Sequence, residues 1–168
     1  MFEIKNKILY ITLSFFIVYG CGIYSFTGAS YGNAKTVTIH LFENKASIVN
    51  PDLAPMLTEK LQDKFINESP LNLLDNDGDL EFQGKIIKYE IKPGQIQAGE
   101  TAASNRLTIT VKVKFTNKLE SQNNYEKTFS WYEDFDANEN LSDVEQDLID
   151  KITDKLVEDI FNEAVVKW

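Results

Sequence analysis

Arg106-Leu107-Thr108-Ile109-Thr110-Val111-Lys112-Val113-Lys114-Phe115-Thr116 is the stretch of this chain with the most regular alternation of polar and apolar residues. An apolar residue at every second position is the period of a β-strand that buries one face and exposes the other to water. The residues expected to face a core are Leu107, Ile109, Val111, Val113 and Phe115. The sequence therefore predicts a sheet, built around this strand, that is covered on one side.

Three further strands are expected around this one. Tyr125–Glu133 follows a polar turn at residues 121–124, with Phe129 and Trp131 in phase, so it should form a hairpin with the central strand. Residues 80–92 read as a strand whose apolar residues change phase, and a bulge at Gly84 would reconcile the two halves. Residues 35–42 alternate with period two, which places Leu41 inward after Val37 and Ile39.

Two helices are expected on one side of that sheet. The first carries apolar residues at spacings of three and four from Leu53 to Phe65, after the helix-start signal Asn50-Pro51-Asp52. The second begins near Ser142, where Ser142 and Glu145 match a capping box, and its apolar stripe runs to the end of the chain. The predicted fold class is α+β, with two helices packed on one face of a mostly antiparallel, four-stranded mixed sheet.

Cys21 is the only cysteine, and it ends an apolar run, Ile8–Gly20, that follows a short head with two lysines. This layout is typical of a secretory signal, and the run is shorter than the roughly 20 apolar residues that span a bilayer. The edge Val18-Tyr19-Gly20-Cys21 resembles a bacterial lipobox, although Tyr19 is bulkier than the usual residue. We expect acylation of Cys21 to anchor the chain in a membrane. The alternatives are a buried structural cysteine and an ordinary signal peptide that is cut nearby.

These observations divide the chain into three parts. Residues 1–20 are expected to be a lipoprotein-type signal peptide, and residues 21–34 a lipidated tether whose aromatic residues dock on their own domain or, alternatively, on a partner. Residues 35–168 are expected to form one α+β domain. Without residues 1–20, the 17 basic and 26 acidic residues become 15 and 25, a net charge of −10. An acidic chain with one arginine is a poor nucleic-acid binder, and a chain with one cysteine cannot form an internal disulfide.

Residues that could carry catalysis or hold a metal or cofactor do not form any recognised pattern. The one histidine, His40, has no second histidine or cysteine near it, and the acidic run Asp75–Asp79 lacks the spacing of a calcium loop and is typical of a turn. We therefore expect no enzyme activity, no cofactor and no metal. A ligand-contact face is the remaining hypothesis: Arg106, Lys112 and Lys114 form a positive stripe on the outer side of the central strand, suited to lipid phosphates. The alternative is a solvated polar face.

Several segments resemble the LptE family, the lipoprotein partner of the outer-membrane lipopolysaccharide translocon. The segments that carry this resemblance are Cys21–Gly28, Val49–Pro51, Leu71–Leu73, Gly78–Leu80, Glu100–Val111 and Val157–Phe161. The resemblance implies a non-enzymatic subunit that plugs the lumen of a large β-barrel protein, LptD, helps it to assemble, and contacts lipopolysaccharide. It also implies an outer-membrane protein that faces the periplasm and is held in the lipid layer through acylated Cys21.

The assignment of Arg106, Lys112 and Lys114 to lipopolysaccharide contact is made on their chemistry and is not transferred from the family. The alternative function is a periplasmic lipid- or solute-binding lipoprotein that serves a transporter.

Overall fold

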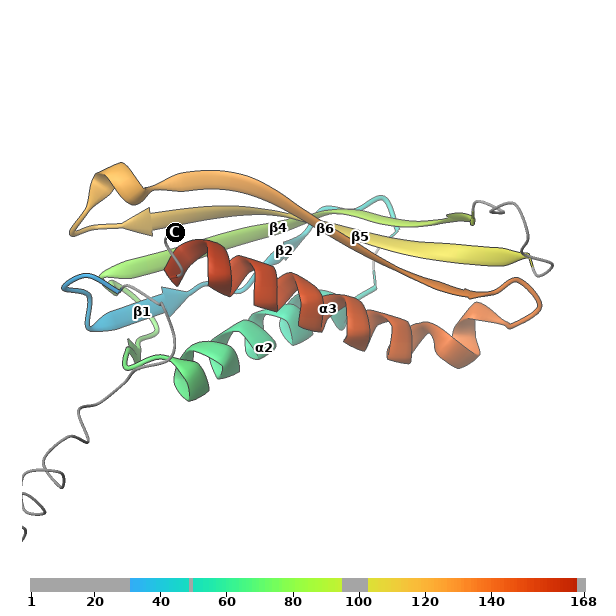
Figure 1. The fold of residues 1–168 in the computed structure, drawn as a ribbon, viewed down its shortest axis with the longest axis horizontal. Coiled ribbons are helices and arrows are strands. Elements are labelled where there is room, and N and C mark those ends of the chain that lie inside the picture. The colour runs from blue at the N-terminus through green and yellow to red at the C-terminus, as the bar shows by residue number, and fades with distance from the viewer. Residues whose placement is uncertain (1–30, 49, 95–102, 166–168) are drawn as a thin grey trace, which may run out of the picture.

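The computed structural model describes residues 31–48, 50–94 and 103–165 of the 168-residue chain. Three long strands and two helices make up most of this part (Figure 1). In chain order the elements are β1 (Thr36–Ile39), β2 (Glu43–Asn44), α2 (Leu53–Glu68), β3 (Asn72–Leu73), β4 (Leu80–Pro93), β5 (Ser104–Asn117), a 3₁₀ turn η2 (Ser121–Asn123), β6 (Tyr125–Asp136) and α3 (Leu141–Val165).

The strands form one mixed sheet in the order β3-β1-β4-β5-β6, with β2 also paired to β4. The long strands β4, β5 and β6 pair antiparallel, whereas β1, β2 and β3 pair parallel to their neighbours. The predicted α+β class and the mixed sheet are confirmed, but the expectation of four strands is wrong, because the described residues form six. The two additional strands, β2 and β3, are two residues each, too short to show an alternating pattern in sequence.

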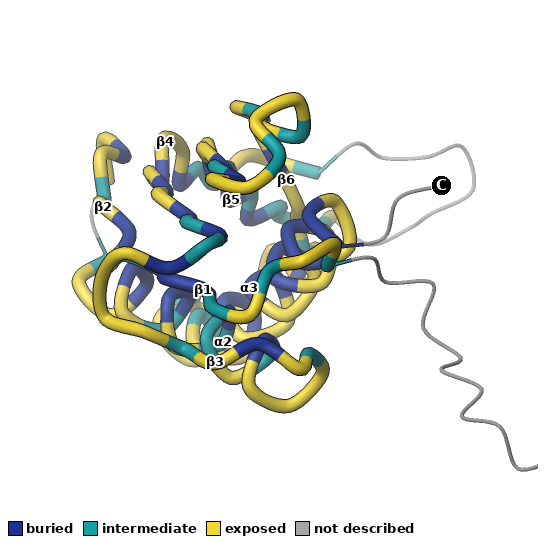
Figure 2. The backbone as a smooth tube through the Cα atoms, turned by 90° about the vertical axis from the view of Figure 1, so that its left-hand side faces the viewer, coloured by how far each residue is buried: buried dark blue, intermediate teal, exposed yellow. Residues whose placement is uncertain are grey.

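Both helices lie on the same face of the sheet (Figures 1 and 2), and buried residues gather between the two layers. Aromatic rings connect the layers in one continuous series, in which consecutive ring centroids are 4.9 to 5.1 Å apart. The series runs from α3 through α2 to the sheet in the order Phe161, Phe65, Phe82, Phe115, Tyr125. Each such pair contributes about 0.5–1.5 kcal/mol beyond the apolar area that it buries. The series therefore ties α3, α2 and three strands into one core.

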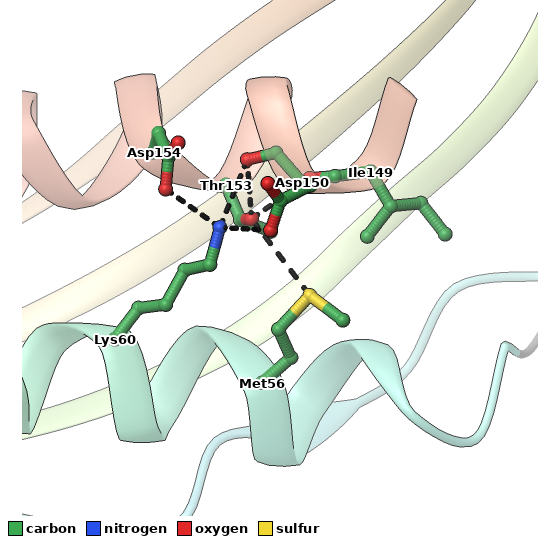
Figure 3. A network of polar contacts seen from close by, with 6 residues as sticks. All are labelled: Met56, Lys60, Ile149, Asp150, Thr153 and Asp154. Atoms are coloured by element: carbon green, nitrogen blue, oxygen red, sulfur yellow. Dashed lines mark hydrogen bonds and ion pairs between the residues drawn. The ribbon is translucent and has the colours of Figure 1, made fainter. Parts of the chain in front are cut away.

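The helix–helix contact has a polar rim over this apolar core (Figure 3). The ammonium group of Lys60 on α2 lies 2.6 Å from carboxylate oxygens of both Asp150 and Asp154, one turn apart on α3. Below it, the Thr153 hydroxyl donates to the Ile149 carbonyl at 2.8 Å and lies 3.9 Å from the sulfur of Met56. The neighbouring residues on α3, such as Ile152 and Leu156, are completely buried.

Two details of the predicted strands are wrong, and they share one cause. The chain bends after Ile39, so Leu41 is 67% exposed and Phe42, at 2%, is buried in its place. The ring of Phe42 lies against Gly84, where an added Cβ would be 2.3 Å from a ring carbon. Gly84 therefore makes room for a ring and is not a bulge, and the shift in pairing occurs between Ile86 and Lys88 instead.

The start of the described chain docks on the body, as expected for this part of the tether. The side chain of Tyr31 packs against the core, and its hydroxyl donates to the carbonyl of Glu68, the last residue of α2, at 3.2 Å. Cys21, the expected signal peptide and residues 21–30 of the expected tether lie outside the described residues.

Candidate functional site

The outer face of the sheet, opposite the helices, carries the three basic residues singled out in the sequence. Alternation along β5 turns Arg106, Lys112 and Lys114 to this side, while Ile109 and Val111 between them point into the core. The register then sets their neighbours on β4 and β6. The outer face is thus built of rows of side chains that run across three strands.

Arg106 is bound to its neighbours on β6. Its guanidinium donates two hydrogen bonds to the carboxylate of Asp134, at 2.7 and 2.8 Å, and lies over the ring of Tyr132 with its central carbon 3.6 Å from the ring centroid. The hydrogen bond from Arg106 holds the pKa of Asp134 below its usual range. Both partners are about one-third or more exposed, so solvent screens the attraction and the pair contributes little to stability.

Lys112 and Lys114 belong to a second group, about 20 Å along the strand from Arg106 at roughly 3.3 Å per residue. Lys112 lies 2.6 Å from the carboxylate of Glu126 on β6, and Lys85 on β4 is its direct cross-strand partner. Lys114 is in register with Glu126 and forms no ion pair with any side chain of the described residues. We call Lys85, Lys112 and Lys114 the lysine cluster.

The lysine cluster has more positive than negative charge at close range. Hydrogen bonding to Lys112, with the added fields of Lys114 and Lys85, lowers the pKa of Glu126, so this carboxylate stays ionised among three cations. Among the described residues, the ion pair of Lys85 is a long one, with 3.9 Å between its ammonium group and the carboxylate of Glu43. Like charges directly opposite on a sheet are destabilising, and an anion that binds between them relieves the repulsion. The cluster is suited to bind a phosphate or another small anionic group.

The sequence placed Lys112 and Lys114 correctly on this face but missed Lys85. Lys85 joins the cluster only through the β4–β5 register, and the bulge between Ile86 and Lys88 shifts that register by one residue. An alternating pattern alone would not reveal this neighbour. Arg106, by contrast, lies apart from the cluster and is already occupied by Asp134.

The acidic run at residues 75–79 is a turn, as expected. Asp77 adopts a left-handed conformation with φ 64°, and the Asp79 carboxylate accepts hydrogen bonds from the main-chain N–H groups of Lys35 and Thr36 at 2.9 and 3.1 Å. These bonds lower the pKa of Asp79. Within the described ranges, no three histidine, cysteine or acidic side chains are grouped as metal ligands would be.

Helix α3 is the longest helix of the described residues, with 25 residues, and charged side chains alternate with apolar ones along it. Neither α2 nor α3 has an uninterrupted apolar stretch of the length needed to cross a bilayer.

Comparison with protein families gives one match that covers the body. The model of the family LptE, described as lipopolysaccharide-assembly, matches residues 34–164. These residues contain all six strands and almost all of α3. A comparison with curated protein sequences found no match.

Solved structures share the fold at low identity. A minor lipoprotein from Acinetobacter baumannii is 12% identical, with a TM-score of 0.51 over 77% of this chain and 91% of that one. A hypothetical protein from Chlamydia trachomatis is 7% identical, with a TM-score of 0.54 over 78% and 98%. A putative neuraminyllactose-binding hemagglutinin homolog from Helicobacter pylori is 9% identical, with a TM-score of 0.51 over 78% and 83%. At these identities the likeness concerns the fold alone.

Proposed function

Because the chain belongs to the LptE family of lipopolysaccharide-assembly proteins, we propose that it is the lipoprotein subunit of an outer-membrane lipopolysaccharide translocon. In this role it occupies the lumen of an LptD-type β-barrel protein, helps that barrel to assemble, and works without catalysis. Acylated Cys21 holds it in the outer membrane, with the body facing the periplasm.

The observation that carries the proposal is the family match over residues 34–164, which is nearly the whole described body. Two structural features support it. The aromatic series from Phe161 to Tyr125 fills the space between helices and sheet, which favours a body that acts through its surface over one that encloses a lipid or solute. The outer face of the sheet also offers the lysine cluster to an anionic ligand.

We assign the lipopolysaccharide contact to Lys85, Lys112 and Lys114. Lipopolysaccharide carries phosphate groups, and an ammonium group binds phosphate as a point charge with three donors. Arg106 is the weaker candidate of the original three, because two of its donors are already bonded to the Asp134 carboxylate and its guanidinium lies over the ring of Tyr132.

Co-purification tests the function as a whole. The full-length protein, tagged at its C-terminus and isolated from outer membranes in mild detergent, should recover a β-barrel protein in a one-to-one ratio. An untagged strain controls for non-specific recovery. Repeated isolation of the lipoprotein alone, or with a bound solute and a transporter subunit, would exclude the proposed role and favour the alternative of a periplasmic binding lipoprotein.

A further inference from the structure

Strand β6 leaves a long edge of the sheet open. It is the last strand in the order, it has 12 residues, and it pairs only with β5 within the part of the chain that the structure describes. The opposite side of the sheet is closed by strands of two residues each. Figure 1 shows β6, coloured orange, beside β5 and leading into α3. Proteins usually protect their sheet edges, so a long open edge calls for an explanation.

The register shows which main-chain groups of β6 face outward. Pairing between β5 and β6 is regular from Ser104↔Asp136 to Phe115↔Tyr125, and beyond it the N–H of Ala137 donates to the carbonyl of Ala103 at 3.0 Å. Because hydrogen-bonded and non-hydrogen-bonded pairs alternate in an antiparallel ladder, every second residue of β6 directs its N–H and C=O away from β5. These residues are Glu126, Thr128, Ser130, Tyr132, Asp134 and Asp136, of which Asp136 already accepts the N–H of Glu139 at its carbonyl, at 3.0 Å.

Two aromatic side chains flank the middle of this edge. Trp131 is 37% exposed and Tyr132 is 48% exposed, although the other large apolar residues of β6, Phe129 and Phe135, are buried. Consecutive residues of a strand point to opposite faces, so one ring lies on each side of the edge. An additional strand beside β6 would satisfy the outward main-chain groups and cover both rings, which are residue types that carry much of the energy at interfaces.

We infer that the β6 edge is a docking site for an extended, basic segment of a second protein, which adds to the sheet as a further strand. Charge complementarity selects this occupant. Within Tyr125–Asp136 there are four carboxylates and one lysine. Glu126 is paired with Lys112, Asp134 with Arg106, and Lys127 with Glu163 on α3. Among the described residues, this leaves the carboxylates of Glu133 and Asp136 without an ion pair, so the edge is negative at its Asp136 end. A segment with lysine or arginine near Glu133 and Asp136, and apolar residues beside Trp131 and Tyr132, would match this end of the edge.

A second copy of this chain is a poorer occupant. Two β6 strands paired antiparallel along most of their length place Glu126 opposite Asp136 or Asp134 in both halves of the pair, according to the register. Directly opposed like charges destabilise a sheet. The inference deepens the proposed function. It rests on that function for one point, that the second protein is the β-barrel partner.

The test uses a substitution that affects the open edge alone. Thr128 directs its N–H away from β5, so Thr128→Pro removes an outward donor and leaves the β5–β6 ladder intact. Thr128→Ala is the matched control, because it keeps the N–H. In the same cells, a photo-crosslinking amino acid replaces Trp131 or Tyr132 in full-length protein. We expect both positions to crosslink to one basic segment of the barrel protein, and the yield to fall about fivefold or more with Thr128→Pro alone.

Each outcome decides between the two proposals. Equal crosslinking in the proline and alanine variants, a product at twice the mass of this chain, or no crosslink from either position overturns the edge inference, even if the barrel protein still co-purifies. If no barrel protein co-purifies with the unsubstituted protein, the proposed function fails. The edge inference then stands only if the crosslinks map to a basic extended segment of another protein and depend on the Thr128 N–H. If Thr128→Pro does not fold, the crosslinks from Trp131 and Tyr132 alone decide.

Discussion

The ring of Phe42 occupies the space directly beside Gly84, and a Cβ at residue 84 would lie 2.3 Å from a carbon of that ring. Phe42 is fully buried, and its N–H donates to the Thr58 hydroxyl of α2 at 3.0 Å. The bend after β1 is therefore held in place by both the ring and the main-chain N–H of Phe42. The absence of a side chain at residue 84 makes this packing possible.

Gly84→Ala should destabilise the protein by about 1–3 kcal/mol, the usual cost of inserting a methyl group into a packed core. Urea unfolding of the detergent-purified protein measures this change. Gln83→Ala, at an exposed position of the same strand, is the control and should change the free energy of unfolding by less than about 0.5 kcal/mol. Adding Phe42→Leu to Gly84→Ala should recover part of the loss, and no recovery would show that the ring is not the obstacle.

Tyr89 on β4 is hydrogen-bonded to Glu145 near the start of α3, and this contact should affect stability at alkaline pH. Burial, followed by a hydrogen bond to Glu145, raises the pKa of Tyr89 above its usual value. A tyrosine whose pKa is raised by folding contributes its full stability below the pKa of the unfolded state, about 10, and loses it as the pH rises further. Burial also raises the pKa of Tyr125, so the unsubstituted protein should become less stable as the pH rises above about 10.

The variants Tyr89→Phe and Tyr125→Phe distinguish the contribution of the Tyr89–Glu145 hydrogen bond to stability from the effect of burying a tyrosine hydroxyl. Both should reduce the loss of stability at alkaline pH. Only Tyr89→Phe should also cost about 1.5–3 kcal/mol at pH 7, because it removes a donor to a carboxylate. The Tyr125 hydroxyl is buried without a partner among the described residues, so its removal should cost little. Urea unfolding from pH 7 to 11 measures both effects, and identical costs at pH 7 would contradict this interpretation.

The apolar interface between α2 and α3 should contribute more to the free energy of unfolding than its polar rim does. Lys60 bonds to Asp150 and Asp154, but both carboxylates are more than half exposed, so Lys60→Met should cost about 1 kcal/mol or less and depend on salt. Leu156→Ala, at a completely buried position of the same helix, should cost about 2–5 kcal/mol and be insensitive to salt. Thermal unfolding at low and high salt distinguishes them, and a larger effect of Lys60→Met would reverse this ranking.

Much of the fold could be predicted from the sequence, because its elements repeat a regular period. The alternation in β5 and the three-and-four spacing in α2 extend over enough residues to define a buried face. The contacts between elements could not be predicted in this way. Glu145, for example, matches the capping-box pattern with Ser142, yet its carboxylate accepts hydrogen bonds from Tyr89 and Asn50, which come close only after folding.

The candidate site was predicted in part for the same reason. Alternation alone assigned Lys112 and Lys114 to the outer face, since both lie on one strand. The addition of Lys85, and the loss of Arg106 to Asp134, depend on cross-strand register, which the alternating pattern does not specify.

Substitutions in the lysine cluster should weaken lipopolysaccharide binding without changing the stability of the protein. Lys114 forms no ion pair within the described part of the chain, so Lys114→Gln should change the free energy of unfolding by less than about 0.5 kcal/mol. Binding of labelled lipopolysaccharide to the purified protein should nevertheless weaken several-fold, and more so for Lys112→Gln with Lys114→Gln. Lys155→Gln on α3, which removes the same charge elsewhere, is the control. Equal weakening by the control would indicate an effect of net charge alone.

Cys21 should determine where the protein resides. The thiol is the expected site of acylation, and two or more acyl chains hold a protein in a membrane because each buried methylene contributes about 0.8 kcal/mol. Cys21→Ser has no thiol to acylate, so the protein should appear in the periplasmic fluid or retain its leader, as fractionation and the mass of the intact protein would show. The lysine cluster and the aromatic series lie in the body, so the unfolding free energy of that body should not change. Membrane attachment that is unchanged in Cys21→Ser, with no acyl group on the mature protein, would falsify the anchor and leave the fit inside a partner as the means of retention.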